Sequence, residues 1–324
     1  VPTRHEVTTL PTSGDLKPPL VVMAADVEPT TYQVGDATAD IDSLVEAGFP
    51  PPSLLLTPFH YAAQKTRYRA AGGYSPAWAS ARALAERLEP RLSAAGCVGP
   101  VLVRCSNVGE ISRVLEMAES YGFDRVIVLG AHISASHACK SQRELTDDVL
   151  RRQESMAVTY TPSLWSSDAM AELVANKALG VIHDPPVTGV ALVVHGQPGD
   201  YAYTNADFDA DENSFTNRVR TLLLEAGLTA SRVRVCPMEW GRPDLTETVR
   251  HLGALGARHI AVVPACYPFA NLQTLLDIPV AIREARLAED VRVVQVPPWG
   301  DDPVFAEVLE ASVRSAMANW GTTV

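Results

Sequence analysis

Short runs of apolar, mostly β-branched residues alternate along this chain with longer segments in which apolar residues recur at helical spacing. The apolar runs lie at 19–25, 101–105, 125–131, 190–196, 232–237, 259–265 and 291–297. Between them, the segments 77–96 and 111–122 repeat apolar residues every three or four positions. Continuously apolar strands separated by helices are typical of parallel sheets that are covered on both faces. The pattern therefore predicts an α/β protein built from doubly wound parallel sheets.

The two halves of the chain repeat this pattern. A helix, Gly122 and the run VIVLGAH in the first half correspond to a helix, Gly256 and the run HIAVVPAC in the second, at an offset of 256 − 122 = 134 residues. A duplicated plan implies two similar Rossmann-like lobes with a central cleft, and Pro and Gly interrupt the pattern between them. We expect a flexible N-terminal arm at 1–18, a first lobe at 19–180 and a second lobe at 181–324.

Ligands of doubly wound sheets bind beyond the carboxyl ends of the strands, so the residues that follow the predicted strands are the candidates for chemistry. These residues are Ala25, Ser106, His132, His195, Glu239 and Cys266. A strand-end histidine such as His195 has an ordinary pKa of about 6.5, which suits proton transfer at neutral pH. A structural hydrogen-bonding role for His195 is the alternative.

Composition narrows the class of partner. The 324 residues are 47% hydrophobic and 20% charged, with a net charge of −11. An acidic chain is a poor match for nucleic acid or an anionic membrane. No apolar run reaches the roughly 18–20 residues of a membrane helix, and the start lacks a signal peptide. Five scattered cysteines without metal-ligand spacing favour a reducing compartment. We expect a soluble, cytoplasmic protein that acts on a small molecule, in an oligomeric state that the sequence leaves open.

Two loops carry further candidates. Asn271 follows a predicted strand and is a good N-cap for a helix that contains Gln273. The first-half counterpart at 130–141 contains His132 and Ser134 as substrate contacts or ligands, together with Ser136 and His137, although the histidine spacing is not diagnostic of a metal site. Gly72 and Gly73 lack the spacing of a nucleotide-binding loop and are expected to allow close backbone approach beside the cleft.

The acidic stretch 205–215 resembles a calcium loop only superficially. A calcium loop that starts at Asp207 needs Gly at its sixth position and Glu at its twelfth, and these positions hold Glu212 and Arg218. We therefore expect a solvated acidic loop. Delivery of a metal ion to the cleft is the alternative.

Five segments, taken in order, resemble the ferrochelatases, enzymes that insert iron into a porphyrin. YRAAGGYSP, the segment from VLVRC to GAHISAS, VVHGQP, the segment from MEWGRP to VVPACY, and FANLQTLLDI match the family's motifs from about Leu20 to Asp302. The resemblance implies the chelatase fold, no tightly bound cofactor, and a divalent metal such as Fe²⁺ as substrate. Family members that hold an iron–sulfur cluster do so on clustered C-terminal cysteines. No cysteine follows Cys266, so we expect no cluster.

The resemblance also implies roles for individual residues. The histidine of the family's HG-P motif, which lies at the centre of the macrocycle pocket, is His195 here, as a general base or a metal contact. The family's facing Glu and His are replaced by Gln273 and Asn271. Gln cannot accept a proton in solution at any working pH. The proton path would then run through Glu239 or an acidic residue of the 205–212 segment, while Gln273 and Asn271 orient the ring by hydrogen bonds. We further expect the substrate to contact His132, Ser134, Trp240, Tyr68 and Tyr267.

Two enzymatic hypotheses follow. The first is insertion of a divalent metal, iron, into a porphyrin-type tetrapyrrole in haem biosynthesis, with His195 as base. The second is an enzyme of this fold recruited to a different acid–base or lyase reaction in a specialised biosynthetic pathway, without metal insertion. A tetrapyrrole binder without turnover is the non-enzymatic alternative.

Overall fold

Two four-stranded parallel sheets of identical strand order form the centre of the molecule. The computed structural model describes residues 17–35, 38, 41, 45, 57–105, 110–134, 156–197 and 206–320. The first sheet has the order β2-β1-β3-β4, with β1 at Leu20–Ala25, β2 at Val98–Cys105, β3 at Arg125–Gly130 and β4 at Ala157–Tyr160. The second has the order β6-β5-β7-β8, with β5 at Thr188–Val194, β6 at Val233–Pro237, β7 at His259–Pro264 and β8 at Arg292–Gln295.

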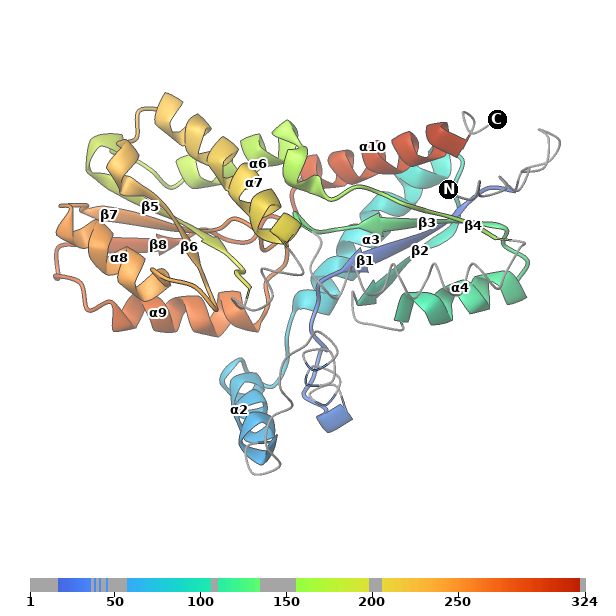
Figure 1. Cartoon of the computed structure of the whole chain (residues 1–324), viewed down its shortest axis with the longest axis horizontal. Helices are drawn as coiled ribbons and strands as arrows, with labels where there is room; N and C mark the ends of the chain where they lie inside the picture. Colours follow the sequence, from blue (N-terminus) through green and yellow to red (C-terminus); the bar gives the residue numbers. More distant parts are fainter. Residues whose placement is uncertain are drawn as a thin grey trace, which may run out of the picture.

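The prediction of two similar doubly wound lobes is confirmed by this topology. Within each lobe the second strand pairs on one side of the first and the third strand pairs on the other, so the chain changes direction at β1 and at β5. The starts of β3 and β7 differ by 259 − 125 = 134 residues, which is the offset found in the sequence. The central strands β1, β3, β5 and β7 are buried along nearly their whole length, as expected when helices cover both faces. Figure 1 shows the two sheets side by side with helices around them.

All the helices except α2 pack against the sheets, and the buried side chains form three hydrophobic clusters. The first-half helices are α2 (Thr57–Ala70), α3 (Ala77–Ala94), α4 (Glu110–Ser120) and α6 (Asp168–Leu179). The second-half helices are α7 (Ala206–Glu225), α8 (Leu245–Ala254), α9 (Ile278–Glu284) and α10 (Pro303–Trp320). A π-helical turn, Gln273–Asp277, directly precedes α9, and short 3-10 turns lie at Leu164–Ser166, Pro185–Val187 and Ala230–Arg232. Helix α4 covers the outer face of the first sheet, and α8 and α9 cover the outer face of the second.

One core runs through both lobes and fixes them against each other. It contains side chains of β1 and β3 together with side chains of β5 and β7, under α3, α6, α7 and α10. Helix α10 belongs by sequence to the second half but lies along α3 and α6, where Glu310 accepts a hydrogen bond from Arg91 at 3.0 Å. Phe215, Trp299 and Phe305 are fully buried in this shared core. The cleft between the lobes therefore has a rigid floor.

The expectation of a solvated loop over 205–215 is wrong for the described residues 206–215, which form the start of α7. Phe208, Phe215 and Val219 follow one face of a helix and are buried. Asp207 and Asp209 lie in the first turn, where acidic residues favour the positive end of the helix dipole. The acidic composition hid a helix whose apolar face begins at Phe208.

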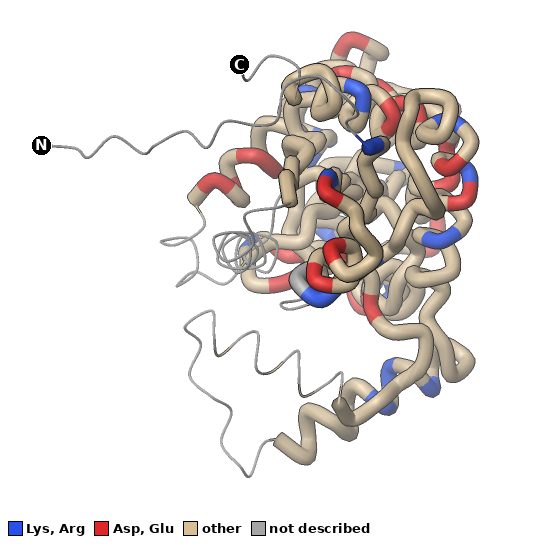
Figure 2. Tube along the Cα trace, turned by 90° about the vertical axis from the view of Figure 1, so that its right-hand side faces the viewer, with Lys and Arg blue, Asp and Glu red and all other residues tan. Residues whose placement is uncertain are grey.

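Helix α2 projects away from both sheets (Figure 1). Its base is held by Tyr68, whose hydroxyl donates to the Pro29 carbonyl at 2.7 Å, and by an ion pair between Arg67 and Asp277. Figure 2 shows acidic and basic residues interspersed over the body of the molecule, whereas the charged residues of α2 are all basic. Among the described residues, no helix is both long and apolar enough to cross a membrane. Most of the predicted N-terminal arm, residues 1–16, lies outside the described part of the chain.

Candidate active site

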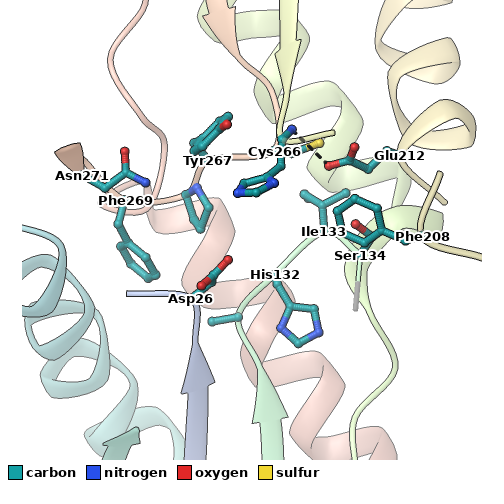
Figure 3. Close-up of a pocket in the computed structure, with 13 residues that line it drawn as sticks. Asp26, His132, Ile133, Ser134, Phe208, Glu212, Cys266, Tyr267, Phe269 and Asn271 are labelled. Atoms are coloured by element: carbon teal, nitrogen blue, oxygen red, sulfur yellow. Dashed lines mark hydrogen bonds between the residues drawn. The ribbon is translucent and has the colours of Figure 1, made fainter. Parts of the chain in front are cut away.

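The carboxyl ends of the central strands of both sheets face each other across a pocket (Figure 3). It is lined by Asp26 after β1, residues 131–134 after β3, His195 after β5, residues 266–269 after β7, Asn271, and Phe208 and Glu212 of α7. β1 and β5 are the strands at which strand order reverses, so the loops on either side of them diverge and leave room for a ligand. The site therefore lies where the topology of both lobes places a crevice.

His195 is the first residue after β5 and is half-buried at the wall of this pocket. Its Nδ1 lies 2.9 Å from the carbonyl oxygen of Gly196. Because a carbonyl can only accept, Nδ1 must hold a proton, and the neutral ring then has its lone pair on Nε2. The Tyr267 ring lies beside the imidazole, with centroids 6.1 Å apart. The backbone hydrogen bond thus fixes Nδ1 of His195, and Nε2 takes no part in that bond.

The backbone beside His195 requires glycine at position 196. Gly196 has a φ of +79°, and a Cβ placed there would lie 2.3 Å from the carbonyl oxygen of Glu239. This close approach lets the Glu239 N–H donate to the His195 carbonyl at 3.2 Å and the Met238 N–H donate to the Val194 carbonyl at 2.8 Å. The residue after the histidine therefore fixes the loop after β6 against the end of β5.

The Glu239 side chain continues this connection to the helix that carries Gln273. Gln273 Nε2 donates to Glu239 Oε1 at 2.9 Å. Gln273 begins the π-helical turn before α9, a feature that often marks functional sites. A carboxylate from the loop beside His195 is thus hydrogen-bonded to Gln273, the residue expected at the family's Glu position.

Asn271 lines the pocket and also caps the helix. Its Oδ1 accepts from the Thr274 N–H at 2.9 Å, and its own N–H donates to Thr274 Oγ1 at 2.8 Å. The N-cap prediction is confirmed, because the helix begins at Leu272. The capping bond occupies Oδ1 and leaves the amide NH₂ group for a ligand.

A second carboxylate lies on the other side of His195. Glu212, in the second turn of α7, is only 4% exposed, and its Oε1 accepts from the His195 N–H at 3.4 Å. Burial raises the pKa of Glu212, against the opposing effects of the His195 charge and of hydrogen bonds from Cys266 and the backbone. Burial alone would lower the pKa of His195, but Asp26, the Gly196 carbonyl, Glu239 and Glu212 together raise it.

The first lobe supplies the opposite wall. Asp26 follows β1 and is exposed to the pocket, and Ser134 is buried there. The His132 ring packs over Gly130 and lies on the same side of the pocket as Asp26 (Figure 3). Burial lowers the pKa of His132, so its neutral form is favoured. Ser136 and His137 lie outside the described residues.

The structure brings together most, but not all, of the residues expected to contact the substrate. His195, Asn271, His132, Ser134 and Tyr267 line the pocket, and Gln273 is linked to it through Glu239. Tyr68 is a buried residue in the last turn of α2, and Trp240 is 54% exposed with a φ of +64°. Neither Tyr68 nor Trp240 is among the residues that line the pocket.

Sequence reasoning did not single out Asp26, Glu212, Phe208 or Phe269 as pocket residues. Asp26 directly follows the strand end that was considered, so one further position would have included it. Glu212 lay within the acidic segment suggested for a proton path, but nothing marked it apart from its neighbours. Its position four residues after Phe208, on the same face of α7, was the available signal.

Two similar lobes with a histidine between facing strand ends are the arrangement expected of a chelatase. Comparison with known proteins agrees with this class. A family model described as ferrochelatase matches residues 47–317. A ferrochelatase of Synechococcus sp. strain JA-3-3Ab is 27% identical over 86% of this chain and 89% of its own, and one of Rippkaea orientalis is 26% identical over 82% and 72%. The chain belongs to the ferrochelatase family.

Solved structures support the fold. SirB from Bacillus subtilis with Fe³⁺ superposes with a TM-score of 0.55 at 18% identity, covering 75% of this chain and 91% of SirB. CbiX, described as the terminal enzyme for biosynthesis of siroheme in denitrifying bacteria, superposes with a TM-score of 0.50 at 14% identity, covering 93% of this chain and 99% of CbiX. The two-lobed architecture is therefore that of the chelatases.

Proposed function

We propose that the chain inserts a divalent metal ion, iron, into a porphyrin-type tetrapyrrole, with His195 as the base. The observation that supports this most directly is the position of His195. It stands at the carboxyl end of β5, with Nδ1 held by Gly196 and Nε2 available, in a pocket shared by both lobes. The names of the relatives, ferrochelatases and a sirohydrochlorin chelatase, agree with this class of substrate.

Metal insertion requires the loss of two pyrrole N–H protons from the ring. A base placed within reach of those protons typically contributes about 10²–10⁴-fold to a rate. In our proposal His195 faces one side of a distorted ring, and the metal approaches the ring nitrogens from the other side. His195 is then a proton acceptor and not a ligand of the metal. Within the described part of the chain, no group of three or more His, Cys, Asp or Glu side chains is placed to hold a metal ion.

The rest of the pocket suits a flat, largely apolar ligand. Phe208, Tyr267 and Phe269 are buried aromatic side chains at its wall. The amide of Asn271 offers a hydrogen bond to the ring or its substituents. Gln273 holds Glu239 in place and orients the ligand from the same helix.

A second candidate function rests on Gln273. The family's Glu at this position is replaced by a residue that cannot accept a proton in water. In this alternative, His195 performs a different acid–base or lyase reaction on another planar substrate, without metal insertion.

Incubation with protoporphyrin or coproporphyrin and Fe²⁺ or Zn²⁺, followed by the porphyrin absorption bands, separates these functions. Metal insertion that is lost in His195→Ala and retained in His183→Ala, an exposed histidine before β5, is the expected result. If the intact protein neither binds the ring nor inserts the metal, the chelatase function is rejected. Binding without insertion, with insertion restored in Gln273→Glu, would indicate a disabled chelatase.

A further inference from the structure

Glu212 is the one Asp, Glu, Lys or Arg residue that is buried among the residues the structure describes, at 4% exposure. A buried carboxylate is costly unless it is paired or hydrogen-bonded. On the same helix, Asp207 is exposed, as an acidic residue of a surface helix normally is. The burial of Glu212 therefore calls for partners that compensate it.

Those partners all belong to the pocket. The carboxylate of Glu212 accepts backbone N–H groups of His195 and Gly196 and the thiol of Cys266. Burial and the neighbouring carboxylate raise the pKa of the Cys266 thiol well above its ordinary value, so the thiol is a neutral donor. Figure 3 shows the carboxylate pointing from α7 toward Cys266. Glu212 is thus held against the loop that carries the base.

The other carboxylates near His195 differ from Glu212 in position. Glu239 is half-buried, and its Oε1 accepts the hydrogen bond from Gln273. Asp26 comes from the opposite lobe and is exposed. Glu212 alone among the three is buried on the same lobe as His195 and also lines the pocket.

We propose that Glu212 is the carboxylate partner of His195 and replaces, from α7, the anionic group that is missing at Gln273. The inference rests on the proposed function. When His195 takes a proton from the ring, the imidazolium gains the attraction of a buried negative charge, and a buried pair interacts more strongly than an exposed one. Glu212 acts through His195 and is a positioning residue. The carboxylate of Glu212 can hold the second proton that metal insertion releases.

The pKa directions agree with an electrostatic coupling between Glu212 and His195. Glu212 and His195 each change the pKa of the other, and the net pKa of both is raised. Groups that face His195 from the remaining elements are Asp26 after β1, Glu239 after β6, and Cys266 and Tyr267 after β7. The last two are neutral, since burial raises the pKa of Tyr267 as well. Asp26 raises the His195 pKa most among the three carboxylates, followed by Glu239 and then Glu212. Removal of Glu212 should therefore lower the His195 pKa only in part.

The test compares Glu212→Gln, Glu212→Asp and Glu225→Gln, the last being the same change at an exposed position at the end of α7. We expect Glu212→Gln to bind porphyrin as the unaltered protein does, while kcat falls about 10- to 100-fold. The acid limb of kcat against pH moves to lower pH, because His195 loses a negative neighbour and its pKa falls. Glu212→Asp restores part of kcat and of the pH profile, and Glu225→Gln changes neither.

A second measurement does not depend on chelatase activity. NMR titration of the histidine side chains, with the His195 signal assigned from its loss in His195→Ala, reports the pKa of His195 in each variant. A lower His195 midpoint in Glu212→Gln, but not in Glu225→Gln, supports the pairing even if the protein inserts no metal. An unchanged midpoint in a folded Glu212→Gln protein overturns it. If Glu212→Gln does not fold, Glu212→Asp is the deciding variant. The pairing is overturned if Glu212→Asp, like Glu225→Gln, has the same His195 midpoint and the same kcat as the unaltered protein.

Discussion

Replacement of Gly196 by Ala tests the close approach between the His195 loop and the backbone of Glu239. Gly196 has a φ of +79°, and an added Cβ would lie 2.3 Å from the Glu239 carbonyl oxygen and 2.8 Å from Pro237 Cβ. A positive φ costs an L-residue about 1–2 kcal/mol. The clash is with backbone, so the loop after β6 must move. That movement would break two hydrogen bonds, from the Glu239 N–H to the His195 carbonyl and from the Met238 N–H to the Val194 carbonyl. Each contributes about 1 kcal/mol to stability.

We therefore expect Gly196→Ala to lower the free energy of unfolding by about 3–4 kcal/mol. Gly227 is the matched control. Its φ is +98°, but nothing lies within 4 Å of an added Cβ, so Gly227→Ala should cost only the strain, about 1–2 kcal/mol. Urea unfolding followed by circular dichroism measures both values, and the porphyrin assay should show a loss of insertion for Gly196→Ala alone. Equal destabilisation of the two variants, or full activity of Gly196→Ala, would refute the role given to this contact.

Three further changes test other parts of the account. Phe215→Ala removes a fully buried ring from the shared core and should cost about 3–5 kcal/mol in urea unfolding; a cost near 1 kcal/mol would contradict a rigid floor. Gln273→Glu places a second carboxylate against Glu239, whose Oε1 lies 2.9 Å from Gln273 Nε2 in the unaltered protein. One of the two carboxyls must then hold a proton, so kcat should fall as pH rises. A kcat above that of the unaltered protein at alkaline pH would contradict this. Glu28 accepts the Leu272 N–H, and burial raises its pKa above the ordinary 4.5. The stabilising contribution of the protonated Glu28 carboxyl is complete below pH 4.5 and is lost as pH rises through the folded-state pKa. Glu28→Gln, whose amide oxygen can still accept the Leu272 N–H, should therefore become more stable relative to the unaltered protein as pH rises above 4.5. No change in that difference with pH would exclude the effect.

The strands and the duplication could be predicted because they depend on local pattern. Continuous apolar runs such as 125–131 allow little except a strand buried on both faces, and the 134-residue offset links corresponding elements. His195 could be found because a ligand site follows from where a central strand ends. β4 at Ala157–Tyr160 was missed because four half-buried residues give too short a pattern.

What could not be predicted depends on contacts between distant parts of the chain. The return of α10 to α3 has no local signal in the sequence. The acidic start of α7 indicated exposure, and the burial of Glu212 results from its packing against the end of β5. Whether Glu239 would reach Gln273 likewise depended on the backbone approach at Gly196.

The central claim is that His195 accepts a proton during metal insertion, and single-turnover metalation of protein-bound porphyrin tests it most directly. Ring binding is complete before Zn²⁺ is added, so the rate reports the chemical step. We predict a rate about 100-fold or more lower in His195→Ala than in the unaltered protein, with the same amount of porphyrin bound. Equal rates in the two proteins would contradict the assignment of His195 as the base.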